Sequence, residues 1–188
     1  RSLDSMTNFG LKSQIGFIGA GSVGGSLAIS LSNNNYSIVA TSSRTFNSAQ
    51  ELAHRIIGCV SYEKHEEVAR VSDVVFITTP DDAIESVVSK MTWRPNQGVV
   101  HCSGVASLDV LKHADNQGAL TGSFHPLQAF SSIDSGVKSI PGITFGIEGT
   151  PKIKTFLKNM AVNIRGNPIF LTSQNKPLYH LSAVMIGN

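Results

Sequence analysis

The sequence predicts an α/β protein whose main body is a doubly wound, mainly parallel sheet, followed by the start of an all-helical C-terminal domain. Two observations carry this prediction. Short apolar runs alternate with helical stretches along most of the chain, which is the pattern of parallel strands joined by crossover helices. The first apolar run, residues 14–18, leads directly into a glycine-rich stretch, and a helical pattern follows at once.

That glycine-rich stretch carries the spacing G-x-G-x-x-G at Gly19, Gly21 and Gly24. The first glycine permits a tight turn, the second lets a pyrophosphate approach the backbone, and the third lets the helix pack closely on the strand. The N-terminus of the following helix offers amide groups and a positive dipole end to phosphates. We therefore expect a Rossmann nucleotide site here, against the alternative of a turn that binds nothing. The residues expected to contact the cofactor are Gly19, Ala20, Gly21, Ser22, Val23 and Gly24.

The elements after the first helix alternate in the order that a doubly wound sheet requires. Strands are predicted at residues 36–41, 57–60, 74–78, 98–102, 119–124, 143–147 and 168–172. Helices are predicted at 49–56, 62–70, from 80 onward, at 108–114, at 152–160 and from 176 to 188. The expected helix starts are a capping box of Ser48 and Glu51, Ser107 as an N-cap, and Thr150 with Pro151. Residues 130–141 are predicted to be a polar loop.

Length and composition limit the function. The 188 residues are 41% hydrophobic and 15% charged with a net charge of +2, so neither a nucleic acid nor a membrane is the expected partner. We expect a disordered leader at 1–12, an NAD(P)-binding domain at 13–172 and the first helix of a truncated substrate and dimerisation domain at 173–188. Cys59 and Cys102 lie in apolar runs, which suggests reduced thiols and a cytoplasmic protein. The six histidines show no metal-ligand spacing.

The end of the second strand indicates which dinucleotide binds. An NAD site places an acidic residue there, about 20 residues after the glycines, to bind the ribose 2′-hydroxyl. This chain instead has Ser42, Ser43, Arg44 and Thr45, with no acid among them. A guanidinium fork and neighbouring hydroxyls suit a 2′-phosphate, so the sequence favours NADP(H) over NAD. The alternative is that Arg44 is an ordinary exposed loop arginine.

Several motifs resemble a known superfamily. The glycine-rich stretch, Ser43-Arg44-Thr45 and residues 77–81 are similar to the 6-phosphogluconate-dehydrogenase-type superfamily, which includes pyrroline-5-carboxylate reductase, prephenate dehydrogenase and deazaflavin-dependent NADP reductase. Residues 101–104, 122–130 and 176–180 resemble a narrower, uncharacterised bacterial family with a Rossmann-like domain and a C-terminal domain of unknown function. The superfamily's helical domain usually forms a homodimer, and its substrate lies between that domain and the nicotinamide.

The resemblance also implies roles for residues beyond the glycines. Thr78, Thr79 and Pro80 would line the cofactor, and Ser103 would border the nicotinamide. His125 resembles the substrate-contacting histidine of prephenate dehydrogenases, and histidine suits proton transfer coupled to hydride transfer. Lys176 stands where β-hydroxyacid dehydrogenases have a catalytic lysine, and His180 lies four residues later on the same helix face.

For the other histidines the expectations are structural. His54, His65 and His113 lie in polar helical stretches and are expected to be solvated, and His101 is expected to be structural. The function predicted from the whole pattern is an NADP-dependent oxidoreductase that acts on a small carbonyl, imine or hydroxy acid. The alternatives are a non-enzymatic NADPH sensor or scaffold, and a vestigial fold that binds no nucleotide.

Overall fold

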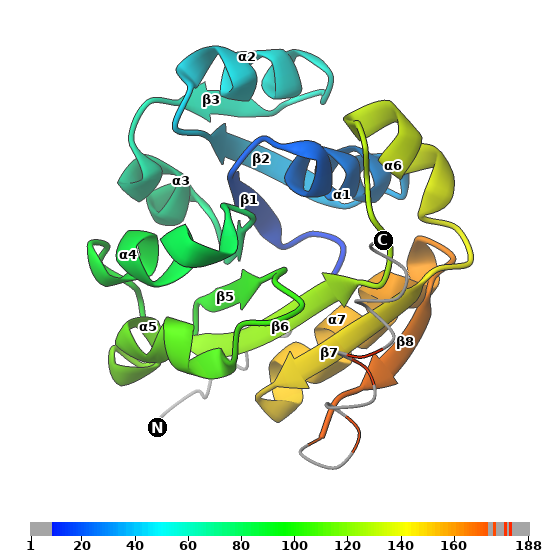
Figure 1. Ribbon diagram of the computed structural model, residues 1–188. Helices are drawn as coiled ribbons and strands as arrows, with labels where there is room; N and C mark the ends of the chain where they lie inside the picture. The colour runs from blue at the N-terminus through cyan, green and yellow to red at the C-terminus, as the bar shows by residue number, and fades with distance from the viewer. Residues whose placement is uncertain (1–8, 173–174, 176–178, 180, 182–188) are drawn as a thin grey trace.

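A computed structural model describes residues 9–172 together with Asn175, Tyr179 and Leu181. Within these residues, eight strands form one sheet that is covered by helices (Figure 1). The strands are β1 (Gln14–Ile18), β2 (Ser37–Ser42), β3 (Val60–Tyr62), β4 (Val74–Ile77), β5 (Gly98–His101), β6 (Leu120–Pro126), β7 (Thr144–Gly149) and β8 (Asn167–Phe170). The α-helices are α1 (Ser22–Asn33), α2 (Phe46–His54), α3 (His65–Val71), α4 (Ile84–Ser89), α5 (Lys112–Asn116), α6 (Ile133–Ser139) and α7 (Pro151–Asn163). Short 3-10 turns η1 (Asp81–Ala83) and η2 (Leu108–Leu111) precede α4 and α5.

The strand order confirms the predicted fold class. The order is β3-β2-β1-β4-β5-β6-β7-β8, and every neighbouring pair is parallel except β6 with β7. After β1 the chain first builds outward through β2 and β3 and then returns to place β4 on the other side of β1. Ligands of doubly wound sheets bind outside the carboxyl ends of the strands at this reversal. The topology therefore locates the crevice beside the C-terminal end of β1.

Each face of the sheet has its own apolar core. One face packs against α1, α2 and α7, and the other packs against α3, α4 and α5. Strand β4 contributes to both, because Val74 and Phe76 point to the first core while Val75 and Ile77 point to the second. This explains why the sequence of β4 is continuously apolar, as in a strand covered on both faces.

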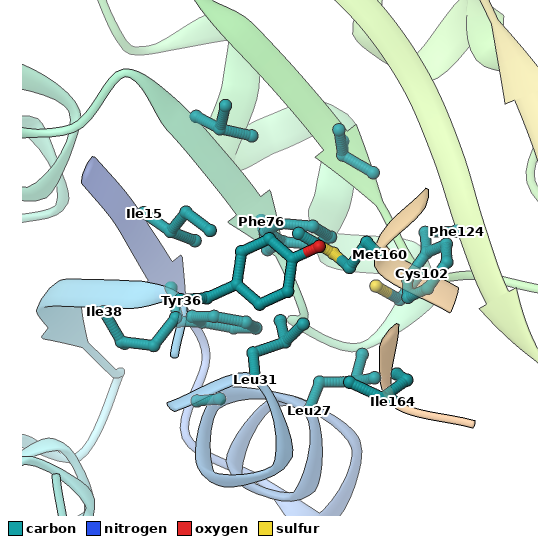
Figure 2. Close-up of a cluster of buried hydrophobic side chains, with 14 of the residues drawn as sticks. Ile15, Leu27, Leu31, Tyr36, Ile38, Phe76, Cys102, Phe124, Met160 and Ile164 are labelled. Carbon is teal, nitrogen blue, oxygen red and sulfur yellow. The ribbon is translucent and has the colours of Figure 1, made fainter. Parts of the chain in front are cut away.

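Aromatic rings form the centre of the first core. Phe17 stacks on Phe76 with ring centroids 5.0 Å apart, and Phe124 stacks on Phe145 at 4.4 Å. Figure 2 shows this core, where Phe76 and Phe124 from the sheet lie among side chains of α1 and α7 such as Leu27 and Met160. All four phenylalanines are fully buried, so the core fixes the spacing between the strands that carry the site.

The predicted loop at 130–141 is wrong, because residues 133–139 form helix α6. Ser132 and Ser135 form a reciprocal capping box at the start of this helix: the Ser132 hydroxyl accepts a hydrogen bond from the Ser135 amide, and the Ser135 hydroxyl accepts one from the Ser132 amide. The helix packs on α1, where Gly136 lies against Ser26. Its short, polar sequence has too few apolar positions to show a helical period. Since the connection stays at one end of the sheet instead of crossing it, β7 runs antiparallel to β6.

Other predicted helix starts are confirmed in part. The expected capping box at Ser48 is wrong, because α2 begins at Phe46 after Thr45 and has no side-chain cap. Ser107 does accept a hydrogen bond from the Asp109 amide, as predicted. Thr150 and Pro151 begin α7 as expected, although the hydroxyl of Thr150 makes no capping bond. The short edge strand lies at 60–62 rather than 57–60.

Toward the two ends, the structure describes only part of the predicted segments. Residues 9–12 of the expected leader lead into a turn in which the Ser13 amide donates to the Gly10 carbonyl, and the ring of Phe9 lies 5.5 Å from that of Phe156. Most of the helix expected from residue 176 lies outside the described residues, as do the candidates Lys176 and His180. The domain boundaries at 12 and 172 stay predictions.

Candidate nucleotide and substrate site

A cleft of about 780 Å³ opens at the carboxyl ends of β1, β2, β4 and β5. It lies at the strand reversal where the topology predicts a ligand site. The glycine-rich turn forms its floor, the loop after β2 forms one wall and the segment after β4 forms another. The lining residues are Gly19, Ala20, Gly21, Ser22, Val23, Ser43, Arg44, Thr45, Ser48, His65, Ile77, Thr78, Thr79, Pro80, Asp81, Asp82, Ala83, Val87, Cys102 and Ser103.

Two of the three glycines hold the turn against β4. Gly19 has a φ of +112°, which only glycine adopts without strain, and a Cβ there would lie 2.5 Å from the Thr78 carbonyl oxygen. A Cβ at Gly24 would lie 2.3 Å from Thr78 Oγ1 and 2.4 Å from the Gly19 carbonyl oxygen. The Thr78 hydroxyl donates a 2.8 Å hydrogen bond to that same carbonyl. Thr78 therefore ties the turn to β4, and neither glycine has room for a side chain.

Gly21 differs, because a Cβ there would meet no atom within 4 Å. It is the N-cap residue of α1, with φ −79° and ψ −170°, and no side chain caps the helix. The first turn of α1 contains no acidic residue. The amides at this helix start therefore have neither a capping oxygen nor a competing carboxylate, and the backbone is open to an anion. This arrangement fits the pyrophosphate of a dinucleotide.

The loop after β2 contributes a positively charged side chain, that of Arg44, to the cleft. Ser43, Arg44 and Thr45 all line it, and Arg44 is exposed. Within the part of the chain that the structure describes, Arg44 makes no ion pair. The Ser42 side chain is instead buried and faces His65, with Oγ 2.8 Å from Nδ1. Ser43 and Arg44 therefore line the cleft, whereas Ser42 does not.

His65 is a cleft residue that the sequence reading missed. The expectation that it is solvated is wrong, because it is half-buried at the start of α3 and lines the cleft. Burial lowers the pKa of its imidazole, which the nearby Glu66 carboxylate partly offsets. Only the pairing of β2 with β3 brings residue 65 beside Ser42, so the local sequence of α3 holds no signal for it.

The end of β5 supplies the far wall of the cleft. Ser103 lines it, and its Oγ accepts hydrogen bonds from the amides of Val105 and Ala106 at 3.2 and 3.0 Å. Burial strongly raises the pKa of the Cys102 thiol, which disfavours the thiolate form that a nucleophilic cysteine needs. His101 is fully buried, and its Nδ1 accepts a hydrogen bond from the Ser103 amide, an arrangement that fits the structural role expected of it.

His125 lies one strand further along, near the end of β6. It does not line the cleft itself, but its imidazole packs directly on Gly104, the residue after Ser103. A Cβ at Gly104 would lie 2.6 Å from both Cε1 and Nε2 of the ring. The other ring nitrogen, Nδ1, lies 2.6 Å from the hydroxyl of Tyr179. Tyr179 is buried, and the sequence reading did not select it.

The described residues include neither a group of side chains that could bind a metal ion nor a helix that could span a membrane. No group of three or more histidine, cysteine or acidic side chains there could hold a metal ion. No helix in that same part of the chain has the length and apolar character needed to cross a bilayer. Cys59 and Cys102 are both free thiols.

Comparison with known families agrees with this geometry. Residues 14–104 match the family described as NADP oxidoreductase, coenzyme F420-dependent, and residues 143–188 match a domain of unknown function. The resemblance to a Rossmann-like domain followed by a domain of unknown function is therefore confirmed. The search of curated protein sequences finds no match.

Solved structures share the fold. A protein from Bacteroides fragilis, named as a candidate NADP oxidoreductase, is 25% identical with a TM-score of 0.76, and the alignment covers 93% of this chain and 66% of that one. An imine reductase from Pseudomonas is 22% identical with a TM-score of 0.74, over 94% and 62% of the two chains. A pyrroline-5-carboxylate reductase from Coxiella burnetii is 17% identical with a TM-score of 0.69, over 88% and 61%. The chain thus spans about two thirds or less of the length of each of these proteins.

Fold, cleft and family match therefore point to the same class. Residues 14–104 have the Rossmann fold and match an NADP oxidoreductase family. Further along the chain, residues 143–188 match a domain of unknown function.

Proposed function

We propose that the protein is an NADP-dependent oxidoreductase that transfers a hydride between NADP(H) and a small carbonyl, imine or hydroxy acid. The observation that carries this proposal is the open backbone at Gly21, which faces the same cleft as the exposed guanidinium of Arg44. A pyrophosphate and a 2′-phosphate are the two anionic groups of NADPH. The cleft offers a separate feature for each of them.

The residues at the far wall support a reaction beside the nicotinamide. When bound, the cofactor supplies or accepts the hydride. Ser103 lies in the cleft wall, and the imidazole of His125 follows directly behind Gly104. We assign His125 the proton transfer that accompanies hydride transfer, since an imidazole can give or take a proton near neutral pH.

The similar structures support the substrate range. An imine reductase and a pyrroline-5-carboxylate reductase both share this fold, and both act on C=N bonds by name. We therefore rank cyclic imines first among the substrates to test, followed by small 2-oxo acids. Proton-transfer roles for Lys176 and His180, the homodimer and a cytoplasmic location stay predictions, since they rest on the sequence.

Calorimetric titration of NADPH and NADH into the wild type and Arg44→Asp tests the cofactor assignment. The variant is expected to weaken NADPH binding by roughly 10- to 100-fold, which is about 1.4 to 2.8 kcal/mol. NADH binding should change by less than about three-fold. Arg70→Asp is the matched control, because Arg70 is an exposed arginine outside this cleft. Equal losses for both dinucleotides would contradict the assignment of Arg44 to the 2′-phosphate.

Turnover assays then separate an enzyme from a sensor. We expect the wild type to oxidise NADPH in the presence of cyclic imines. The rate of this turnover should fall by roughly 100-fold or more in His125→Ala. Tight NADPH binding without turnover of any imine or 2-oxo acid would instead favour the sensor alternative. A chain that binds no dinucleotide at all would refute both.

A further inference from the structure

We propose that Tyr179 is a positioning residue that fixes the tautomer of His125, so that the imidazole keeps its Nδ1 proton and exchanges protons only at Nε2. The relevance of this arrangement to catalysis rests on the proposed function, whereas the arrangement itself does not. Tyr179 comes from beyond β8 and reaches back to β6, so its contact with His125 spans 54 positions of the sequence.

The hydrogen bonds around the phenol decide the tautomer. Tyr179 Oη lies 2.6 Å from His125 Nδ1 and 3.0 Å from the carbonyl oxygen of the same histidine. A phenol carries one hydrogen, and a carbonyl oxygen can only accept. If the phenol donates to the carbonyl, the contact with Nδ1 is a hydrogen bond only when Nδ1 is the donor. Both bonds therefore form together only when Nδ1 carries a proton, which in the neutral ring leaves the lone pair on Nε2.

The same pattern persists when the imidazole is protonated. An imidazolium carries a proton on each nitrogen, so Nδ1 still donates to Tyr179 and the phenol still donates to the carbonyl. The imidazole then gains or loses a proton only at Nε2, the atom that lies against Gly104 beside the cleft wall. Burial raises the pKa of Tyr179 to about 12, so the phenol keeps its own hydrogen across the range in which histidines titrate.

Two glycines make room for this arrangement. A Cβ at Gly146, the β7 partner of His125, would lie 2.7 Å from Tyr179 Cζ and 2.8 Å from Oη. A Cβ at Gly104 would lie 2.6 Å from the imidazole on its other side. The tyrosine ring meets the imidazole edge to face, at 82° with centroids 5.5 Å apart. The ring of His125 thus lies between the bare backbone of Gly104 and the phenol of Tyr179, and that phenol in turn packs on the bare backbone of Gly146. These contacts restrict both the position and the orientation of the imidazole.

Nitrogen-15 NMR of the histidine side chains tests the tautomer without any substrate. At about pH 8, where an ordinary histidine with a pKa of about 6.5 is neutral, we expect His125 to show a protonated Nδ1 and an unprotonated Nε2. Tyr179→Phe keeps the ring but removes the hydroxyl, and the Nε2–H tautomer that an unconstrained histidine side chain prefers should then become the major form. The matched control is Tyr36→Phe, since Tyr36 is equally buried and its hydroxyl accepts from Asn163 far from His125.

A second variant tests the same tautomer if Tyr179→Phe fails to fold. Gly146→Ala retains the tyrosine but displaces its hydroxyl, and it should also raise the share of the Nε2–H tautomer. An Nε2–H tautomer in the wild type, or a tautomer that neither variant changes, would overturn the proposal.

Kinetics separate this proposal from the proposed function. Wrong histidine tautomers have cost up to about 10⁴-fold in kcat in other enzymes, so Tyr179→Phe should lower kcat by about ten-fold or more with the NADPH Kd unchanged. If the tautomer is as inferred but His125→Ala retains full turnover, the positioning role stands and the catalytic role of His125 fails. If turnover depends on His125 but the wild-type tautomer is Nε2–H, the positioning role fails alone.

Discussion

The glycines of the nucleotide turn allow a prediction in which stability and binding change in opposite directions. Gly21→Ser adds a side chain where no atom lies within 4 Å, at the N-cap position of α1. Serine is among the preferred N-cap residues and should keep or raise the free energy of unfolding, by about a few tenths of a kcal/mol. The same side chain occupies the space above the amides, and its hydroxyl accepts their hydrogens. NADPH binding should therefore weaken by at least ten-fold, or about 1.4 kcal/mol.

Gly24→Ala is the opposing variant in the same helix. Its Cβ would lie 2.4 Å from the Gly19 carbonyl oxygen and 2.3 Å from Thr78 Oγ1, so the turn or β4 must shift. Overpacking of this kind costs about 1–3 kcal/mol, and replacing a helical glycine by alanine returns up to about 1 kcal/mol. We expect a net loss of about 1–2 kcal/mol in the free energy of unfolding.

Urea unfolding and calorimetric titration with NADPH, run on both variants and the wild type, provide the comparison. The reasoning is refuted if Gly21→Ser binds NADPH as the wild type does, or if Gly24→Ala is as stable as the wild type. A Gly21→Ser protein that loses both stability and binding would also contradict it, because the open space at Gly21 predicts that folding is unharmed.

Three further predictions concern stability. Burial lowers the pKa of the His65 imidazole in the folded state, so the unfolded chain binds a proton at this histidine more readily, and the free energy of unfolding should fall as the pH drops below about 6.5. His65→Gln should reduce this dependence of the free energy of unfolding on pH, measured by urea unfolding between about pH 8 and 5. An unchanged pH dependence would contradict the lowered pKa of His65. Phe124→Ala should lower the free energy of unfolding by about 3–5 kcal/mol, since the ring is fully buried and stacked on Phe145, and a loss below about 1 kcal/mol would refute that packing. Gly136→Ala places a Cβ 2.0 Å from Ser26 Oγ and should lower the free energy of unfolding by about 1–3 kcal/mol. In a double-mutant cycle, Ser26→Ala should restore part of this loss, whereas additive losses would show that the two positions do not interact.

Much of the fold was predictable because its signals are local. The strand, turn and helix around Gly19 to Gly24 occupy neighbouring residues, so glycine spacing and apolar period reveal them together. The same holds for β4 and β5, whose apolar runs reflect burial on both faces. The cleft residues at the ends of these strands follow from the topology, which places the carboxyl ends of parallel strands at one edge.

The missed features depend on contacts between distant segments. Helix α6 is short and polar, and its packing on α1 rests on Gly136 and Ser26, which no period in the sequence connects. His65 reaches the cleft only because β3 pairs with β2. Tyr179 meets His125 across 54 positions of the sequence, and no local pattern around the tyrosine indicates that contact. Tertiary pairing, rather than local propensity, decides all three.

The central claim is that the amides at the start of α1 hold a pyrophosphate while the loop at Arg44 holds a 2′-phosphate. A crystal structure of this chain grown with NADPH tests it most directly. We expect the diphosphate within hydrogen-bond distance of the backbone between Ala20 and Gly24, and the 2′-phosphate within reach of the Arg44 guanidinium. A cofactor seated elsewhere, or a cleft that holds only water while packing leaves it open, would contradict the account.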